Sequence, residues 1–146
     1  MPPDQGDEPD TSHLKPGAPA IVSVCVTCRM DGSDEVPRIG TLMSEALLEI
    51  MPPRSSPGAI VRGVQCLGVC RRPATVAVSA PQGYTFVFGD LDPQVGAAAI
   101  ATFVRLYRDA DYGFVPWAQR PELLRSRLVA RVPATTWSPP DGNPPA

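Results

Sequence analysis

The spacing of apolar and polar residues predicts a strand, a helix and a second strand in the first half of the chain. An apolar run within residues 18–24 is typical of a buried strand. Apolar side chains then recur at helical spacing from Thr41, a suitable N-cap, to Met51. They are Leu42, Met43, Ala46, Leu47 and Ile50. Residues 59–65 alternate in polarity and predict the second strand. A strand, a helix and a strand of these lengths imply a right-handed crossover, so we expect the two strands to be parallel.

The second half of the chain predicts a β-hairpin and a longer helix. Two β-type runs, residues 74–79 and 84–88, are joined by a short turn that contains proline and glycine. Asp92 is a suitable N-cap for the helix that follows, and Gly113 is a suitable C-cap. A short helical stretch is expected over residues 122–128. The expected fold class is α/β (α+β), with the element order β-α-β-β-β-α and a mixed four-stranded sheet.

Proline is concentrated at both ends of the chain. Ten of the 19 prolines fall within residues 1–20 and 133–146, where few apolar side chains can offset the entropy of ordering. We therefore expect a single domain over residues 19–133. An acidic, proline-rich tail (residues 1–18) and a second proline-rich tail (residues 134–146) should be disordered.

Composition narrows the class of protein. No apolar run approaches the roughly 20 residues that a membrane helix needs. The N-terminus lacks the apolar segment of a secretory signal, so we expect a cytoplasmic protein whose thiols stay reduced. No basic stripe is present, and nucleic-acid binding is therefore not expected.

The four cysteines form two close pairs. Cys25 and Cys28 give a C-x2-C motif after the first predicted strand, and Cys66 and Cys70 give a C-x3-C motif after the second, 37 residues later. Because the carboxyl ends of parallel strands meet at one edge of a sheet, we expect the two pairs to be neighbours. His13 is the only histidine, so a metal site would be built mainly of sulfur. The sequence predicts that these four cysteines are the metal and cofactor ligands.

Three kinds of site fit four thiols in this arrangement. The first is a [2Fe–2S] cluster, and the second is a structural Zn²⁺ in an interaction module. The third is a thiol–disulfide oxidoreductase that uses Cys25 and Cys28. This third reading is disfavoured because a thioredoxin-type motif opens a helix directly, whereas about ten loop residues follow Cys28. Gly68, inside the second pair, either lets backbone N–H groups approach sulfur or only makes a turn.

The cysteines and a few short stretches of sequence resemble those of two protein families. The element order, with cysteines after the first two strands, resembles that of the thioredoxin-like [2Fe–2S] ferredoxins and of related cluster subunits of NADH dehydrogenase and hydrogenases. Residues 20–133 look more closely like a bacterial family of uncharacterised, predicted metal-binding proteins with that fold. The matching stretches are Cys25-Val26-Thr27-Cys28-Arg29, Cys66-Leu67-Gly68-Val69-Cys70, Phe88-Gly89-Asp90-Leu91 and Arg131-Val132-Pro133.

The resemblance implies a thioredoxin-like ferredoxin fold and one-electron transfer by a [2Fe–2S] cluster on Cys25, Cys28, Cys66 and Cys70. The closer family looks associated with cobalamin metabolism, which would place a reductive partner there. An electron carrier rather than an enzyme is expected, because the sequence has no catalytic histidine and no phosphate-binding glycine loop.

The expected partner is a redox protein. Arg71 and Arg72 either steer an acidic partner or are solvated surface charges. Relatives of this fold are often dimers, and the aromatic residues between Tyr107 and Trp117 would suit either a homodimer interface or a buried cluster.

Overall fold

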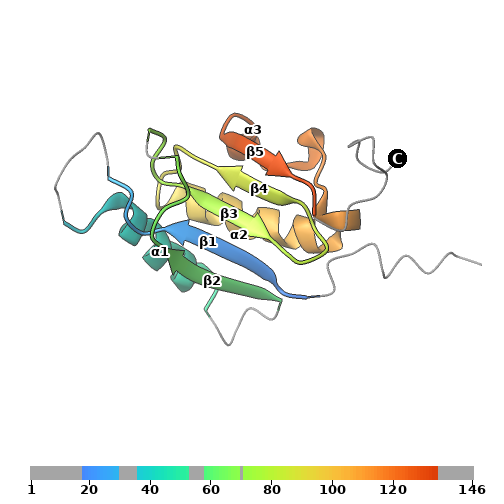
Figure 1. Ribbon diagram of the computed structural model, residues 1–146, viewed down its shortest axis with the longest axis horizontal. Coiled ribbons are helices and arrows are strands. Elements are labelled where there is room, and N and C mark those ends of the chain that lie inside the picture. Colours follow the sequence, from blue (N-terminus) through green and yellow to red (C-terminus); the bar gives the residue numbers. More distant parts are fainter. Residues whose placement is uncertain (1–17, 30–35, 53–57, 70, 135–146) are drawn as a thin grey trace, which may run out of the picture.

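The computed structural model describes residues 18–29, 36–52, 58–69 and 71–134. Most of both predicted tails, and Cys70, lie outside these residues. The described chain folds into one mixed sheet covered by helices (Figure 1). Within the described residues, no helix is both long and apolar enough to cross a membrane.

The sheet has five strands rather than the four that the sequence predicts. Their order across the sheet is β2-β1-β3-β4-β5. β1 and β2 are parallel, as expected, and the other neighbours are antiparallel. The additional strand is β5, which follows the third helix and pairs with β4 at the edge of the sheet. The strands are β1 (Ala20–Cys25), β2 (Ala59–Val64), β3 (Val76–Ser79), β4 (Thr85–Phe88) and β5 (Leu128–Val132).

The helices differ from their predicted limits at the ends. Helix α1 (Ile39–Ile50) begins before Thr41, so Thr41 lies inside the helix and is not its N-cap. The N-cap position of helix α2 (Val95–Asp109) is Gln94 rather than the predicted Asp92, although the Asp92 carboxylate accepts the backbone N–H groups of Gln94 and Val95 at 2.9 and 3.2 Å.

The predicted C-cap of α2 is wrong. The helix ends at Asp109, and Gly113 closes a separate 3₁₀ turn with a φ of +67°, a conformation that suits glycine. Helix α3 (Glu122–Arg125) is shorter than the stretch expected over residues 122–128, which leaves the following residues free to form β5.

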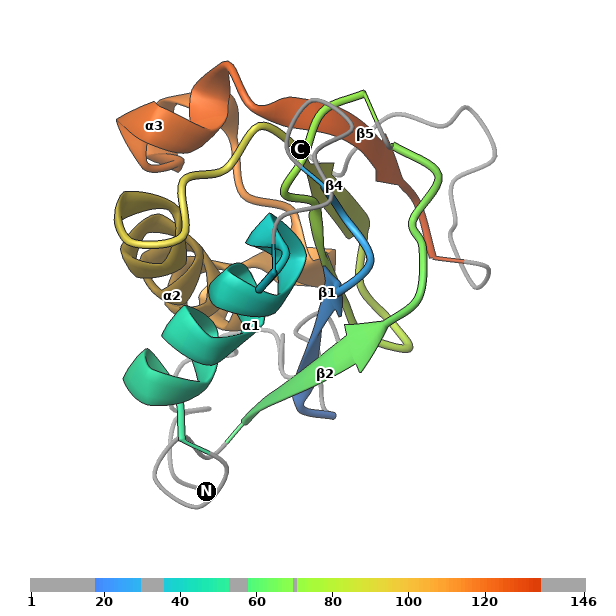
Figure 2. The ribbon, with the colours of Figure 1, turned by 90° about the vertical axis from the view of Figure 1, so that its left-hand side faces the viewer.

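Helices α1 and α2 pack on the same face of the sheet (Figure 2). The α1 residues that reach the core are Met43 and Leu47, whereas Leu42 and Ile50 of the predicted stripe are 39% and 45% exposed. From α2, the Phe103 ring lies 5.0 Å from both Phe86 and Phe88 on β4. The core therefore centres on aromatic contacts between α2 and the sheet.

Tyr107 belongs to this buried aromatic cluster. It is fully buried, and its hydroxyl donates a hydrogen bond to the Tyr84 carbonyl oxygen at 2.7 Å. Burial raises the pKa of Tyr107, so the phenol stays protonated. Trp117, in contrast, is 60% exposed and lies against the Arg125 guanidinium, 4.6 Å from the ring centroid. The sequence suggested either a homodimer interface or a buried cluster for the aromatic residues in this region. Tyr107 lies in a buried cluster, whereas Trp117 does not.

Candidate metal centre

The two cysteine loops leave the sheet at the same edge. Parallel register pairs Cys25, the last residue of β1, with Val64, the last residue of β2. The Val26 N–H then donates to the Val64 carbonyl oxygen at 2.9 Å, which extends the pairing one residue beyond the strands. The chain therefore continues into the two cysteine motifs from adjacent positions.

The Cys25 and Cys28 side chains lie together and are shielded from solvent. They are 2% and 4% exposed, and a hydrogen bond joins the two thiols. The Thr27 side chain lies between the loops: its Oγ1 is 3.5 Å from Cys25 Sγ, and its hydroxyl donates to the Gln65 carbonyl oxygen. Cys25, Thr27 and Cys28 thus form one compact group at the end of β1, which we call the cysteine corner.

Helix α1 begins beside this corner. The Gly40 N–H donates to the Cys28 carbonyl oxygen at 3.4 Å. A Cβ on Gly40 would lie 1.9 Å from the Cys25 carbonyl oxygen, so only glycine fits this close approach. Because about ten residues separate Cys28 from the helix, the sequence did not indicate that the start of α1 contacts the first cysteine loop.

The second loop crosses directly over the Cys25 thiol. Cys25 Sγ lies 3.5 Å from the Gln65 carbonyl oxygen, and the Leu67 N–H also hydrogen-bonds to this sulfur. Cys66 stands between these two residues in the chain. The backbone on both sides of Cys66 is therefore in contact with Cys25.

The Cys66 side chain is exposed and accepts a hydrogen bond from the Gly68 N–H at 3.2 Å. Gly68 has a φ of +79°, so it makes a turn and also brings a backbone N–H group to sulfur. Gly68 therefore does more than make a turn, and the first sequence reading describes it. Cys70 lies outside the described residues, and among those described no three histidine, cysteine or carboxylate side chains are grouped to hold a metal ion.

Thr75 is a site residue that the sequence reasoning missed. It is fully buried just before β3, and its Oγ1 lies 3.9 Å from Cys28 Sγ. Its carbonyl oxygen also accepts the Cys25 N–H at 3.0 Å. Thr75 could have been identified in the sequence as a polar residue within an apolar strand segment. A buried hydroxyl group there needs a hydrogen-bond partner.

The two thiols of the first motif differ in acidity. Burial is the largest influence on Cys25 and acts to raise its pKa, but hydrogen bonds from Thr27, Cys28 and the Leu67 backbone outweigh it. The pKa of Cys25 is therefore below its ordinary value. At Cys28, burial, the hydrogen bond with Cys25 and the negative charge of Cys25 raise the pKa to about 11. Cys25 is the first of the two to lose its proton.

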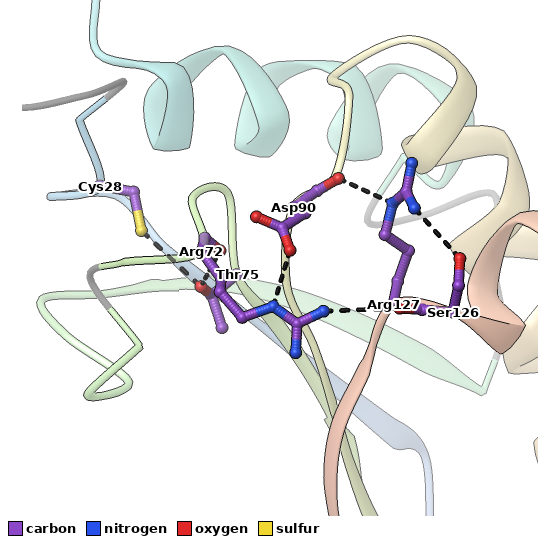
Figure 3. Close-up of polar contacts among 6 residues, drawn as sticks. All are labelled: Cys28, Arg72, Thr75, Asp90, Ser126 and Arg127. Carbon is purple, nitrogen blue, oxygen red and sulfur yellow. Dashed lines mark hydrogen bonds and ion pairs between the residues drawn. The ribbon is translucent and has the colours of Figure 1, made fainter.

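A polar network continues from Thr75 to the C-terminal part of the domain (Figure 3). Arg72 Nε lies 2.6 Å from Asp90 Oδ2, and its guanidinium also donates to the Ser126 carbonyl oxygen at 3.5 Å. Arg127 Nε donates to the Asp90 carbonyl oxygen at 3.0 Å. Arg72 is therefore paired within the domain, whereas Arg71 is exposed.

The residues of this corner fit a thiolate-bound metal centre in their donor chemistry. Two buried thiols lie in contact, and backbone N–H groups of Leu67 and Gly68 reach the sulfurs of Cys25 and Cys66. Hydrogen bonds of this kind stabilise the charged form of sulfur. In the described part of the chain, however, Cys66 faces solvent and does not complete a ligand group with Cys25 and Cys28.

Comparison with solved structures supports the observed fold. The structure is similar to that of a thioredoxin-like [2Fe–2S] ferredoxin from Aquifex aeolicus, with a TM-score of 0.50 and 16% sequence identity, over 82% of this chain and 99% of that chain. At this identity the similarity establishes the fold alone. The family described as "Protein of unknown function (DUF1636)" matches residues 22–134. No curated protein matches the chain.

Proposed function

Because the chain belongs to the family described as "Protein of unknown function (DUF1636)", a description that gives no activity, we propose a function from the cysteine loops themselves. The protein is a small iron–sulfur electron carrier that holds a [2Fe–2S] cluster on Cys25, Cys28, Cys66 and Cys70. Such a cluster, when bound, supplies one-electron redox chemistry.

The observation that carries this proposal is the crossing of the second loop over Cys25. The Gln65 carbonyl oxygen and the Leu67 N–H both contact the Cys25 sulfur. This contact puts the Cys66 backbone beside the first cysteine pair, although 37 residues separate Cys28 from Cys66. A four-thiolate cluster requires two thiol pairs, and in this proposal Cys66 supplies the second pair together with Cys70.

The surrounding residues have separate tasks in this proposal. Cys25 and Cys28 supply buried ligands from which water is largely excluded. The Gly68 and Leu67 N–H groups stabilise thiolate charge, which for a bound cluster raises the reduction potential. Cys66 is exposed, so a redox partner protein exchanges electrons with the centre on the side of Cys66.

The thioredoxin-like ferredoxin from Aquifex aeolicus supports a cluster over zinc, because it is a [2Fe–2S] protein with a similar fold. The partner is a redox protein. A partner in cobalamin metabolism is a prediction from the sequence resemblance alone. The second candidate is a zinc-stabilised interaction module, which the same four thiols would also serve.

Anaerobic purification tests the proposal. The absorption spectrum, iron content and acid-labile sulfide of the full chain should be measured together. We expect a brown protein with two irons and two sulfides per chain, which dithionite bleaches. A colourless protein with one zinc per chain would contradict the electron carrier and support the zinc module.

A further inference from the structure

Thr75 places a buried hydroxyl group between a candidate ligand and a backbone carbonyl. Its side chain is fully buried, with Cys28 Sγ 3.9 Å from its Oγ1 on one side. On the other side, the hydroxyl donates to the Arg72 carbonyl oxygen at 3.1 Å. Figure 3 shows Thr75 between the Cys28 sulfur and Arg72. A hydroxyl has one proton to donate, so it serves one of these two acceptors at a time.

The Arg72 carbonyl does not depend on this hydroxyl. The Asp90 N–H donates to the same oxygen at 3.0 Å. When the Thr75 hydroxyl turns away, the carbonyl still keeps one partner, so no buried acceptor is left unsatisfied. The Thr75 proton is therefore available to the sulfur.

Whether the Cys28 sulfur donates or accepts a hydrogen bond decides which way this hydroxyl points. A Cys28 thiol donates its own proton to Thr75 Oγ1, which leaves the hydroxyl to donate to Arg72. A metal-bound Cys28 has no proton and accepts only. The sulfur can then accept hydrogen bonds from Thr75, whose backbone N–H already reaches it and whose hydroxyl lies 3.9 Å away.

We propose that Thr75 is a positioning residue that donates a hydrogen bond to the sulfur of metal-bound Cys28. The bond stabilises the thiolate ligand and fixes the orientation of the Cys28 side chain. The inference rests on the proposed function only in that Cys28 binds a metal; it holds for a cluster and for zinc alike. The Arg72–Asp90 ion pair and the Asp90 N–H hold the segment before β3 in place around Thr75.

Binding of Co²⁺ to the metal-free, reduced full chain tests this role, because thiolate–cobalt absorption reports directly on the sulfur ligands. Thr75→Val removes the hydroxyl and keeps a similar shape, whereas Thr75→Ser keeps the hydroxyl. We expect Thr75→Val to weaken Co²⁺ binding about tenfold, which lies at the lower end of the range for a hydrogen bond to a charged group. We also expect its sulfur-to-cobalt absorption to move to longer wavelength, with Thr75→Ser restoring both properties.

The matched control is Thr41→Val, since the Thr41 hydroxyl donates to the Val26 carbonyl oxygen at 3.4 Å, close to the same loop. It should leave the cobalt spectrum unchanged. If Thr75→Val does not fold, Thr75→Ala and Thr75→Ser make the same comparison. Equal affinity and equal spectra for wild type and the hydroxyl-free variant would overturn the inference, as would the absence of cobalt–thiolate absorption in the wild type.

The outcomes also separate this inference from the proposed function. A cobalt effect of Thr75→Val in a protein that never incorporates iron and sulfide keeps the Thr75 role and refutes the electron carrier. If a cluster does assemble, its reduction potential should be lower in Thr75→Val than in Thr75→Ser. Equal potentials in these two variants would overturn the role of Thr75 while leaving the electron carrier intact.

Discussion

Only two residues separate Cys25 from Cys28, yet the fold shifts the pKa values of their thiols in opposite directions. In the metal-free, reduced protein, we expect iodoacetamide to modify Cys25 before Cys28 at pH 7–8, because only the thiolate reacts. The pKa of Cys25 is lowered, so its reaction rate should level off at lower pH. The pKa of Cys28 is raised to about 11, so its rate should still increase through pH 9.

Peptide mass spectrometry after timed alkylation measures both rates. The control variant is Cys25→Ser, which removes the negative charge that contributes to the raised pKa of Cys28. Alkylation of Cys28 should then become faster. Faster modification of Cys28 than of Cys25 in the wild type would contradict the assignment.

Cys66 gives the simplest test of the second pair. In the proposed centre its sulfur is a ligand, so Cys66→Ser should lose most of the bound metal, measured by elemental analysis of the anaerobically purified protein. Gln65→Ala is a suitable control, because it removes an exposed side chain and keeps the carbonyl oxygen that contacts Cys25. Full metal content in Cys66→Ser would show that Cys66 is not a ligand.

At the residue scale, the sequence predicted the parallel strands that lead into the two cysteine loops, but not the residues that surround the cysteines. Parallel pairing of β1 and β2 follows from the pattern of apolar residues, and it brings Cys25 and Cys66 to one edge. The role of Thr75 could not be predicted, because it depends on β3 lying on the other side of β1. That neighbour is set by the whole sheet rather than by local spacing.

At the scale of elements, α1 and the first cysteine loop depend on each other through Gly40. Gly40→Ala would place its Cβ 1.9 Å from the Cys25 carbonyl oxygen, and a backbone atom cannot move away cheaply. We expect a loss of about 2 kcal/mol in the free energy of unfolding, as for other overpacked sites. Urea denaturation of the metal-free protein measures this loss.

Glu49→Ala is the control for that experiment, because Glu49 is an exposed residue of the same helix and both residues favour helices. It should change stability by less than about 0.5 kcal/mol. A stability loss in Gly40→Ala no larger than in Glu49→Ala would mean that α1 and the cysteine loop can separate without cost.

The element that the sequence pattern failed to identify is β5. Two of its five residues are half-buried and three are exposed, so no regular alternation of buried and exposed positions identifies it as a strand. Its position instead depends on the Gly89 N–H, which donates to the Arg127 carbonyl oxygen at 2.9 Å, and on pairing with β4. Helix α3 (Glu122–Arg125) is only four residues long, which the apolar spacing also did not predict.

At the scale of the whole molecule, the hydrophobic core cluster of the described residues includes none of the cysteines. Phe86, Phe88 and Phe103 are fully buried and in mutual contact, together with Tyr107. Aromatic side chains bury large apolar areas, so this cluster stabilises the contact between α2 and the sheet by itself.

We therefore expect chelation of the metal to leave the domain folded. The metal-free protein should keep its far-ultraviolet circular dichroism and unfold cooperatively in urea, with a lower midpoint than the loaded protein, because a ligand that binds only the folded state adds stability. Loss of cooperative unfolding on chelation would instead place this protein with small domains that fold around their metal.

The parallel pairing of β1 and β2 has a practical consequence at the end of the sheet where both strands begin, opposite the cysteine loops. Ala20 and Ala59 begin the two strands there, and β1 runs over six residues from Ala20 to Cys25. At about 3.3 Å per residue, a fluorophore or surface anchor attached at Ala20 would lie about 17 Å along the strand from Cys25. The protein can thus be immobilised or labelled by one end while the other remains open to a partner.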